Sequence, residues 1–277
     1  MVWVYWENIN PKVKEPAYIT LSRWTMLNNL SDCMVIFVNP DNIEKYLPGI
    51  NQLVDGIEVE VRGRLDRFCR HFTPSNRKNI AVKCDVIRSL LLYYYGGVYL
   101  DADAIVLDDF NKYFDLLEQH QFIIPQRQSH NKDHMSISFY GSTAKGKIIT
   151  LYTQAIKQRL SQNKEVAYNE LGAGMLTPIV KAHQDAAYIF DESETQPITY
   201  ENSVSHFLST DLNPEDILPK EQIIFMLFND PFQGEMKNIL IQDLYHSDML
   251  ISKIFRKAIP EEAFNHLLRG NGLAVST

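Results

Sequence analysis

The sequence predicts an α/β fold in which helices cover both faces of a mostly parallel sheet. Two observations lead to this class. Short apolar segments alternate with amphipathic ones, which is typical of doubly wound sheets. The 277 residues are 45% hydrophobic and 22% charged, ordinary values for a globular protein that buries a sizeable core. The length favours one large domain with insertions over two complete domains.

The first elements follow this alternation in order. An apolar run of strand type opens the chain at 2–6, and residues 17–30 have helical spacing. A buried strand is expected at 33–40, where a proline stops it, and a short helix at 41–49, opened by an aspartate or asparagine cap. Strict alternation at 57–63 predicts a strand with one exposed face.

A basic stretch at 62–78 interrupts the pattern. It holds six of the 27 lysines and arginines of the chain and a single acid, Asp66. One interpretation is a solvated loop. The other is a local positive patch that attracts phosphate groups, from either a phosphorylated donor or a lipid phosphate.

The clearest predicted helix runs from residue 79 to about residue 95. Gly96 follows it at a position that favours a left-handed backbone, and 98–100 resume as a strand. The remaining elements are strands at 122–125, 135–141 and 223–228, helices at 145–160 and 172–183, and a helical or mixed region at 235–258.

Charge and cysteine content exclude several classes of protein. The net charge of −7 disfavours binding to nucleic acid. Three cysteines without C-x-x-C spacing argue against a disulfide framework or a structural zinc site, and they favour a reducing compartment. We see neither a signal peptide nor an apolar run long enough to cross a membrane. We therefore expect a cytoplasmic protein, with peripheral contact to the inner membrane face as the only membrane association.

Two aspartates, Asp101 and Asp103, follow the short strand at 98–100. This places them at the carboxyl end of a sheet strand, where open α/β sheets bind ligands. In an extended segment both carboxylates would project to the same side, and they could converge on one Mg²⁺ or Mn²⁺ ion that shares phosphate oxygens. The alternative is a pair that only caps a turn or solvates an edge, since short motifs of this kind occur by chance.

The preceding helix carries a second charged pair. Asp85 and Arg88 are three residues apart and share one helix face. An ordinary intrahelical ion pair would explain them. However, their neighbours are apolar, and a charged pair beside a buried stripe is costly unless it is fully hydrogen-bonded. A polar ligand at the sheet edge would supply such bonds.

Asp85-x-x-Arg88 followed by Gly96-Gly97-Val98-Tyr99-Leu100-Asp101-Ala102-Asp103 resembles the DXD sugar-binding region of a glycosyltransferase family. That family includes bacterial capsule and lipopolysaccharide transferases, yeast initiating α-mannosyltransferases and clostridial glucosylating toxins. The resemblance is close over residues 79–110, looser at the opening strand and weak after residue 120. It implies a GT-A fold and an enzyme that retains the anomeric configuration of the donor.

The resemblance also implies roles for individual residues. The catalytic residues would be Asp85, Arg88 and Asp101, the first two holding hydroxyls of the transferred sugar. Asp103 would bind the divalent metal directly, and Asp101 would bind the ribose and sugar and reach the metal through water. The donor site would further include Trp6, stacked on the base, and Tyr99.

Three details of these assignments stay open. Trp6 could instead be a core residue, and a regular strand is expected to turn Trp3 to the same face. Family members take a last metal ligand from a C-terminal loop, for which His246 is the candidate, with Ser247 or Asp248 as substitutes.

The predicted function is metal-dependent transfer of a sugar from a nucleotide-sugar donor, a UDP-sugar by analogy, to a saccharide or lipid-linked saccharide acceptor. Bacterial capsule, lipopolysaccharide or exopolysaccharide synthesis is the expected setting, and Mn²⁺ or Mg²⁺ the expected cofactor. Residues 1–120 would bind the donor and 121–277 would face the acceptor within one domain. The alternatives are a metal-dependent phosphoryl- or nucleotidyl-transfer enzyme, with Asp108 and Asp109 at a second metal, and a non-catalytic nucleotide-sugar-binding module.

Overall fold

A six-stranded sheet forms the centre of the computed structural model, which describes residues 1–8, 12, 14–55, 57, 74–127, 134–229, 236 and 238–270. Its strand order is β2-β1-β3-β6-β5-β7. The strands are β1 (Val2–Tyr5), β2 (Val35–Val38), β3 (Gly97–Leu100), β5 (Phe122–Gln126), β6 (Phe139–Ser142) and β7 (Ala187–Asp191). The strands β1, β2, β3, β5 and β7 all run in one direction and only β6 is antiparallel to its neighbours. The predicted α/β class with a mostly parallel sheet is confirmed.

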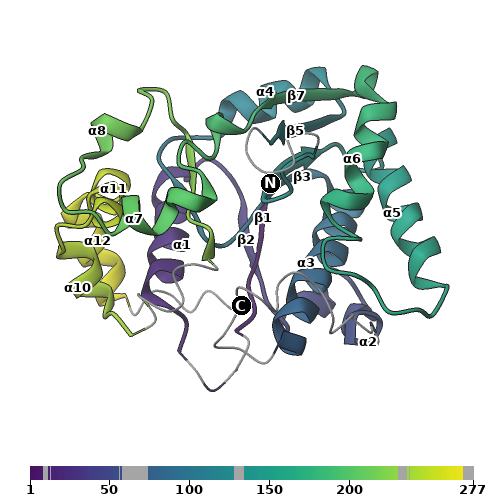
Figure 1. Ribbon diagram of the computed structural model, residues 1–277, viewed down its shortest axis with the longest axis horizontal. Helices are drawn as coiled ribbons and strands as arrows, with labels where there is room; N and C mark the ends of the chain where they lie inside the picture. Colours follow the sequence, from purple (N-terminus) through teal and green to yellow (C-terminus); the bar gives the residue numbers. More distant parts are fainter. Residues whose placement is uncertain are drawn as a thin grey trace.

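Helices cover both faces of this sheet, with α3, α5 and α6 on one side and α1 and α10–α12 on the other (Figure 1). Alternate residues of β1 enter different cores: Trp3 and Tyr5 face the side of α3, while Val2 and Val4 face the side of α1. The helices are α1 (Ala17–Asn29), α2 (Ile50–Asp55), α3 (Pro74–Tyr95), α4 (Asn111–Gln119), α5 (Lys147–Leu160), α6 (Ala173–Ala182), α7 (Ser203–Phe207), α8 (Pro214–Ile217), α10 (Ile241–His246), α11 (Leu250–Ala258) and α12 (Glu261–Arg269). Short 3₁₀ turns lie at Ile43–Lys45, Gln184–Ala186, Glu192–Glu194 and Tyr200–Asn202.

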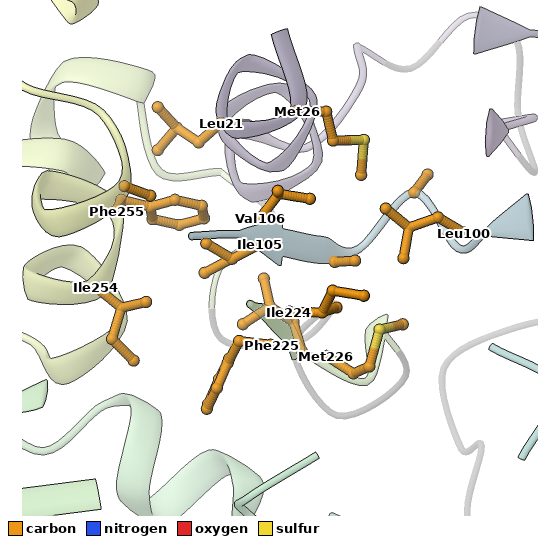
Figure 2. Packing of buried hydrophobic residues seen from close by; sticks show 14 of the residues in the cluster. Leu21, Met26, Leu100, Ile105, Val106, Ile224, Phe225, Met226, Ile254 and Phe255 are labelled. Carbon is orange, nitrogen blue, oxygen red and sulfur yellow. The ribbon is translucent and has the colours of Figure 1, made fainter. Parts of the chain in front are cut away.

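A small second sheet connects the two halves of the chain. β4 (Ala104–Val106) pairs antiparallel with β8 (Ile224–Met226), and Ala104 lies opposite Met226. Figure 2 shows β4 between α1 on one side and β8 on the other, with Phe255 of α11 packed at its end. All six strand residues are buried, so this pair is held in the core. The residues just before β4 and just after β8 are therefore brought together.

Most elements expected from the sequence are present at or near their expected positions. The helix ending at Tyr95 is followed by Gly96 and Gly97 with φ of 66° and 94°, so the glycine pair makes the left-handed turn into β3. The helix begins at Pro74, earlier than expected. The expected strand at 57–63 and most of the basic stretch lie outside the described residues.

Two expected strands have other bounds in the structure. The segment 135–141 is a strand only from Phe139, because residues before it form a loop at the sheet edge. The late strand at 223–228 is shorter and joins the small sheet with β4. The amphipathic helices α4 and α12 were not predicted.

The sequence predicts neither a membrane span nor a disulfide framework. No helix in the described part of the chain is both long and apolar enough to cross a bilayer. Cys33 and Cys84 are free thiols, and burial raises the pKa of Cys84 to about 12, which keeps it protonated and unreactive.

Candidate active site at the carboxyl edge of the sheet

The candidate site lies where α3 and β3 meet at the carboxyl edge of the main sheet. α3 supplies Asp85 and Arg88, and Asp101 follows the last residue of β3. The Ala104 amide donates to the Asp101 carbonyl over 3.2 Å, so residues 101–104 form a turn. The expected extended segment at 101–103 is therefore wrong. The chain turns here because it leaves the main sheet at Leu100 and enters the small sheet at Ala104.

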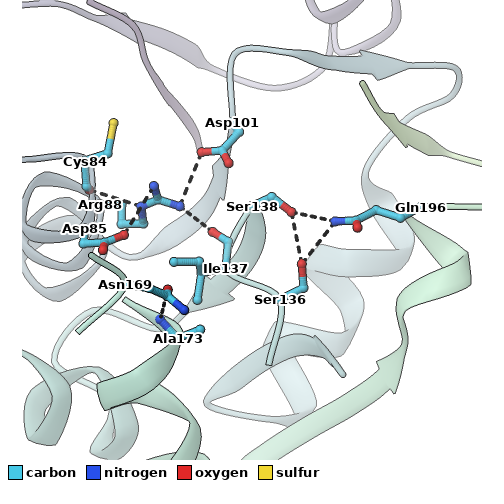
Figure 3. Close-up of polar contacts among 10 residues, drawn as sticks. All are labelled: Cys84, Asp85, Arg88, Asp101, Ser136, Ile137, Ser138, Asn169, Ala173 and Gln196. Carbon is cyan, nitrogen blue, oxygen red and sulfur yellow. Dashed lines mark hydrogen bonds and ion pairs between the residues drawn. The ribbon is translucent and has the colours of Figure 1, made fainter. Parts of the chain in front are cut away.

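Arg88 is the centre of the polar contacts (Figure 3). Its Nη1 lies 3.3 Å from Asp101 Oδ1 and donates to the Ile137 carbonyl over 2.6 Å, while its Nη2 lies 3.5 Å from Asp85 Oδ1. Its Nε donates to the Cys84 carbonyl over 3.1 Å. Only 6% of Arg88 is exposed. Burial alone would lower its pKa, but Asp101 and then Asp85 raise it above the ordinary value, so this guanidinium stays charged.

Tyr99 lies beneath Arg88 and does not line an open site in this structure. The guanidinium carbon is 4.8 Å from the centre of the Tyr99 ring, and Tyr99 is 0% exposed. An aromatic ring whose face is turned toward a buried cation stabilises that cation electrostatically. The structure thus places Tyr99 as a support for Arg88, because residue 99 points into the core on the α3 side of the sheet.

Asp85 is almost fully enclosed, with 4% of its surface exposed. A β-carbon added to Gly172, the residue that precedes α6, would lie 2.6 Å from Asp85 Oδ2 and 2.7 Å from Ile137 Cδ1. Only glycine fits against this carboxyl group. Burial raises the pKa of Asp85 to about 7, and the nearby Arg88 only partly offsets that shift.

Asp103 lies beside Asp101 and is anchored from the other half of the chain. Its Oδ2 accepts a hydrogen bond from the Asn229 amide over 2.5 Å, and its carbonyl accepts one from the Leu227 amide over 3.1 Å. Burial raises the pKa of Asp103 to about 7; Asp101 adds to the shift and the Asn229 amide opposes it. Burial also raises the pKa of Asp101, while Arg88 opposes the shift. Two neighbouring carboxylates disfavour each other's ionisation, so the pair suits a partner of positive charge.

The carboxylates of this site suit a hard divalent cation whose coordination shell is completed by oxygen atoms from other molecules. Asp101 and Asp103 provide carboxylate oxygens, and Asp101 retains 29% exposure of its side chain. Among the described residues, no three His, Cys, Asp or Glu side chains are grouped closely enough to hold a metal ion by themselves. Mg²⁺ and Mn²⁺ sites of this kind use one or two carboxylates and take further oxygens from phosphates and water. The residues present therefore fit such an ion.

His246 is not brought into this group. It is exposed at the end of α10, where its ring packs edge-on against Phe264 of α12 at 5.6 Å. His246 is the last residue of α10 and not part of a loop, and this keeps it on the outer helical layer. The substitutes Ser247 and Asp248 follow directly, and Ser247 Oγ bonds with Ser252 Oγ at 2.7 Å.

Trp6 lies at the same carboxyl edge, just beyond β1. It is half-buried, packs against the core on the α1 side, and donates to Asn8 Oδ1 over 3.1 Å. Trp3 points to the opposite face, is 1% exposed and donates to the Gly96 carbonyl over 3.0 Å. The expectation that both tryptophans share a face is wrong, since residues an odd number apart alternate along a strand.

Sequence reasoning did not identify a polar group on the side of the loop before β6 that is turned away from Arg88. Gln196 Nε2 donates to Ser136 Oγ at 3.1 Å and to Ser138 Oγ at 2.9 Å (Figure 3). The Ser138 carbonyl accepts from the Asp101 amide over 2.8 Å. These residues come from the second half of the chain and show no motif. Only the alternation of serines at 136 and 138 ahead of a strand could have indicated a polar edge.

Residues 21–123 match the family described as glycosyltransferase sugar-binding region containing DXD motif. The match includes Asp85, Arg88, Asp101 and Asp103, and it confirms the resemblance stated from the sequence. The chain thus carries a DXD-type sugar-binding region and is an enzyme, a glycosyltransferase. A comparison with curated proteins finds no match.

Several solved glycosyltransferase structures are similar to this chain at low sequence identity. GlyE of Streptococcus pneumoniae TIGR4 has a TM-score of 0.48 and 13% identity, covering 99% of this chain and 63% of its own. The galactosyltransferase LgtC, solved with donor and acceptor sugar analogues, has a TM-score of 0.44 and 12% identity over 96% of this chain and 99% of its own. Mouse xyloside xylosyltransferase 1 has a TM-score of 0.47 and 9% identity over 83% and 98%.

Proposed function

We propose that this glycosyltransferase is metal-dependent and retaining, and that it moves a sugar from a UDP-sugar to a saccharide acceptor. The observation that carries this proposal is the linkage of Asp85, Arg88 and Asp101 at the carboxyl edge of the sheet, next to Asp103. Arg88 thereby links Asp85, its partner in the proposed sugar site, to Asp101.

Asp103, with Asp101, would hold the divalent cation. Bound there, Mn²⁺ or Mg²⁺ acts as a Lewis acid toward the charge that develops on the departing diphosphate. The protein contributes the rigidity of the two carboxylates: Arg88 holds Asp101, and the Asn229 amide holds Asp103. A site held in place before the reaction costs no reorganisation during it.

Asp85 and Arg88 would form the floor of the sugar site. Their exposures of 4% and 6% fit groups at the bottom of a site, where a hydrogen bond to a sugar hydroxyl is shielded from water. Such bonds orient the anomeric carbon, and they strengthen as the sugar gains oxocarbenium character. Trp6 at the same edge would stack on the base. No protein nucleophile is assigned.

The donor and acceptor halves are proposed to be 1–120 and 121–277 within a single domain. Support comes from the main sheet, because β6 of the second half pairs with β3 of the first. Further support comes from Ile137 and Gly172, which contact Arg88 and Asp85. The acceptor would approach from the side of the Ser136, Ser138 and Gln196 group.

We place the enzyme in bacterial capsule, lipopolysaccharide or exopolysaccharide synthesis, in the cytoplasm or peripherally on the inner membrane face. A lipid-linked saccharide is then the natural acceptor. The support is the resemblance in residues 79–110, together with the absence of a candidate membrane span among the described helices.

The alternative of phosphoryl or nucleotidyl transfer needs further acids near the first pair for a second metal. Asp108 and Asp109 do not supply them, because both are exposed beyond the far end of β4. Nothing in the described residues favours this reaction.

The test is a panel of nucleotide sugars, with Mn²⁺ or Mg²⁺, assayed for release of free nucleoside diphosphate. Asp103→Ala is expected to abolish release while the protein stays folded by circular dichroism, and the matched control Asp108→Ala is expected to keep activity. A folded Asp103→Ala variant with full activity contradicts the proposal. Loss of activity in Asp108→Ala, with release of phosphate or pyrophosphate, would support the alternative.

A further inference from the structure

A short segment after β8 holds the carboxylate of Asp103. The Leu227 amide donates to the Asp103 carbonyl and the Asn229 amide donates to Asp103 Oδ2. The first bond continues the register of β4 with β8, in which Ala104 lies opposite Met226. The second reaches past the sheet to the side chain itself. Residues 126 positions apart are joined by this contact.

The backbone between these two donors is unusual. Phe228 has φ of 58°, a left-handed conformation that residues other than glycine seldom adopt because the side chain crowds the backbone. Such a conformation persists only where the surrounding structure stabilises it. Here the Phe228 ring packs edge-on against Tyr200 at 5.6 Å. The left-handed residue lies between the Leu227 amide, which completes the ladder, and the Asn229 amide, which turns toward the Asp103 carboxylate.

The side chain of Asn229 is fixed in turn from the other half of the chain. The hydroxyl of Tyr18, on α1, donates to Asn229 Oδ1 in a short hydrogen bond. Tyr18 is 0% exposed and belongs to the core on the α1 side of the sheet. A continuous path therefore runs from the rigid core through Tyr18 and Asn229 to one oxygen of Asp103.

We infer that Asn229 and Tyr18 are positioning residues for Asp103. A carboxylate that is fixed by one oxygen presents its other oxygen in one direction, and this lowers the entropy that a cation must remove on binding. The inference rests on the proposed function, because it assumes that Asp103 is a metal ligand. Neither residue touches the substrate or the reacting atoms in this scheme.

The experiment measures Mn²⁺ binding to the metal-free protein, alone and with excess UDP, from the electron paramagnetic resonance signal of free Mn²⁺. Two variants remove the tether at different points: Tyr18→Phe deletes the hydroxyl, and Asn229→Ala deletes its acceptor but keeps the amide that reaches Asp103. The matched control is Tyr245→Phe, which deletes an equally buried hydroxyl bonded to the Ile259 carbonyl at 2.7 Å on the helical layer.

Loss of a group that orients a metal ligand typically weakens metal binding by about 10-fold or more. We expect that loss in Tyr18→Phe and in Asn229→Ala, and unchanged Mn²⁺ affinity in Tyr245→Phe. Thermal unfolding is measured alongside, because a purely structural role predicts that Tyr18→Phe and Tyr245→Phe lower the melting temperature alike without any change in affinity.

The two ideas fail in different ways. Wild-type affinity in both folded tether variants, with binding lost in Asp103→Ala, overturns the positioning role and leaves the proposed function intact. Equal Mn²⁺ affinity in wild type and Asp103→Ala, with and without UDP, overturns the metal role of Asp103 in the proposed function itself.

Discussion

Replacing Asp85 with asparagine tests the electrostatics of the site through stability alone. The side chain is 4% exposed and fits against Gly172, so an isosteric amide is the one substitution that keeps the packing. Burial raises the pKa of Asp85 from 3.8 to about 7 in the folded protein. Stability contributed by a group with a raised pKa is present at low pH and is lost as the pH rises through that pKa.

The size of the effect follows from the two pKa values of Asp85. At pH values where Asp85 is ionised in the unfolded chain but protonated in the folded protein, each pH unit removes about 1.4 kcal/mol from the free energy of unfolding. Between about pH 5 and about pH 8, the free energy of unfolding of wild type should fall by about 2 to 3 kcal/mol more than that of Asp85→Asn. This fall should be complete just above pH 7. Loss of the contact with Arg88 also changes the overall stability of the variant, so the slope of stability against pH carries the prediction and not the absolute stability.

The assay is urea unfolding of metal-free protein, followed by circular dichroism across this pH range. Asp101 and Asp103 are present in both proteins, so the difference between the two curves reports the titration of Asp85 together with its coupling to Asp101 through Arg88. Asp41→Asn, on an exposed loop, is the control and should run parallel to wild type. If Asp85→Asn also runs parallel to wild type, Asp85 is ionised in the folded protein throughout and the reasoning from burial fails.

Two further substitutions probe how the site is held. Arg88→Lys keeps the positive charge but loses the planar guanidinium that reaches Asp101 and the neighbouring carbonyls, so kcat/KM for donor turnover should fall by about 10-fold to 100-fold. Unchanged kinetics would show that the charge alone suffices. Gly172→Ala places a β-carbon against Asp85 and should lower both the melting temperature and the turnover. The control Gly270→Ala, whose nearest contact would be at 3.5 Å, should change neither. Equal behaviour of the two variants would show that Asp85 can move away freely.

The local elements around the site were predictable because their signals are short-range. The apolar stripe of α3, the glycine pair with positive φ and the apolar strand β3 all follow from residues close together in the chain. The resemblance in Asp85-x-x-Arg88 and Asp101-x-Asp103 lies in the same continuous segment. For this segment, fold and candidate residues could both be read from the sequence.

The assignments that failed required knowledge of distant neighbours. The turn at 101–104 exists because β4 pairs with β8, more than a hundred residues later, instead of extending β3. His246 was chosen from its place in the chain, whereas helix packing puts it against Phe264. The assignment of Trp3 and Trp6 to one face is a different kind of error, because the alternation of a strand, which is local, already separates them.

The sequence by itself determined that this chain folds as an α/β protein and presents Asp85, Arg88, Asp101 and Asp103 near one strand end, since helical and strand periodicity act over a few residues. Only the tertiary structure decided how those side chains are held. Arg88 bonds to the Ile137 carbonyl, Asp85 fits against Gly172, and Asp103 accepts from the Asn229 amide. These contacts join segments far apart in the chain and depend on close packing in three dimensions, so no local pattern of residues encodes them.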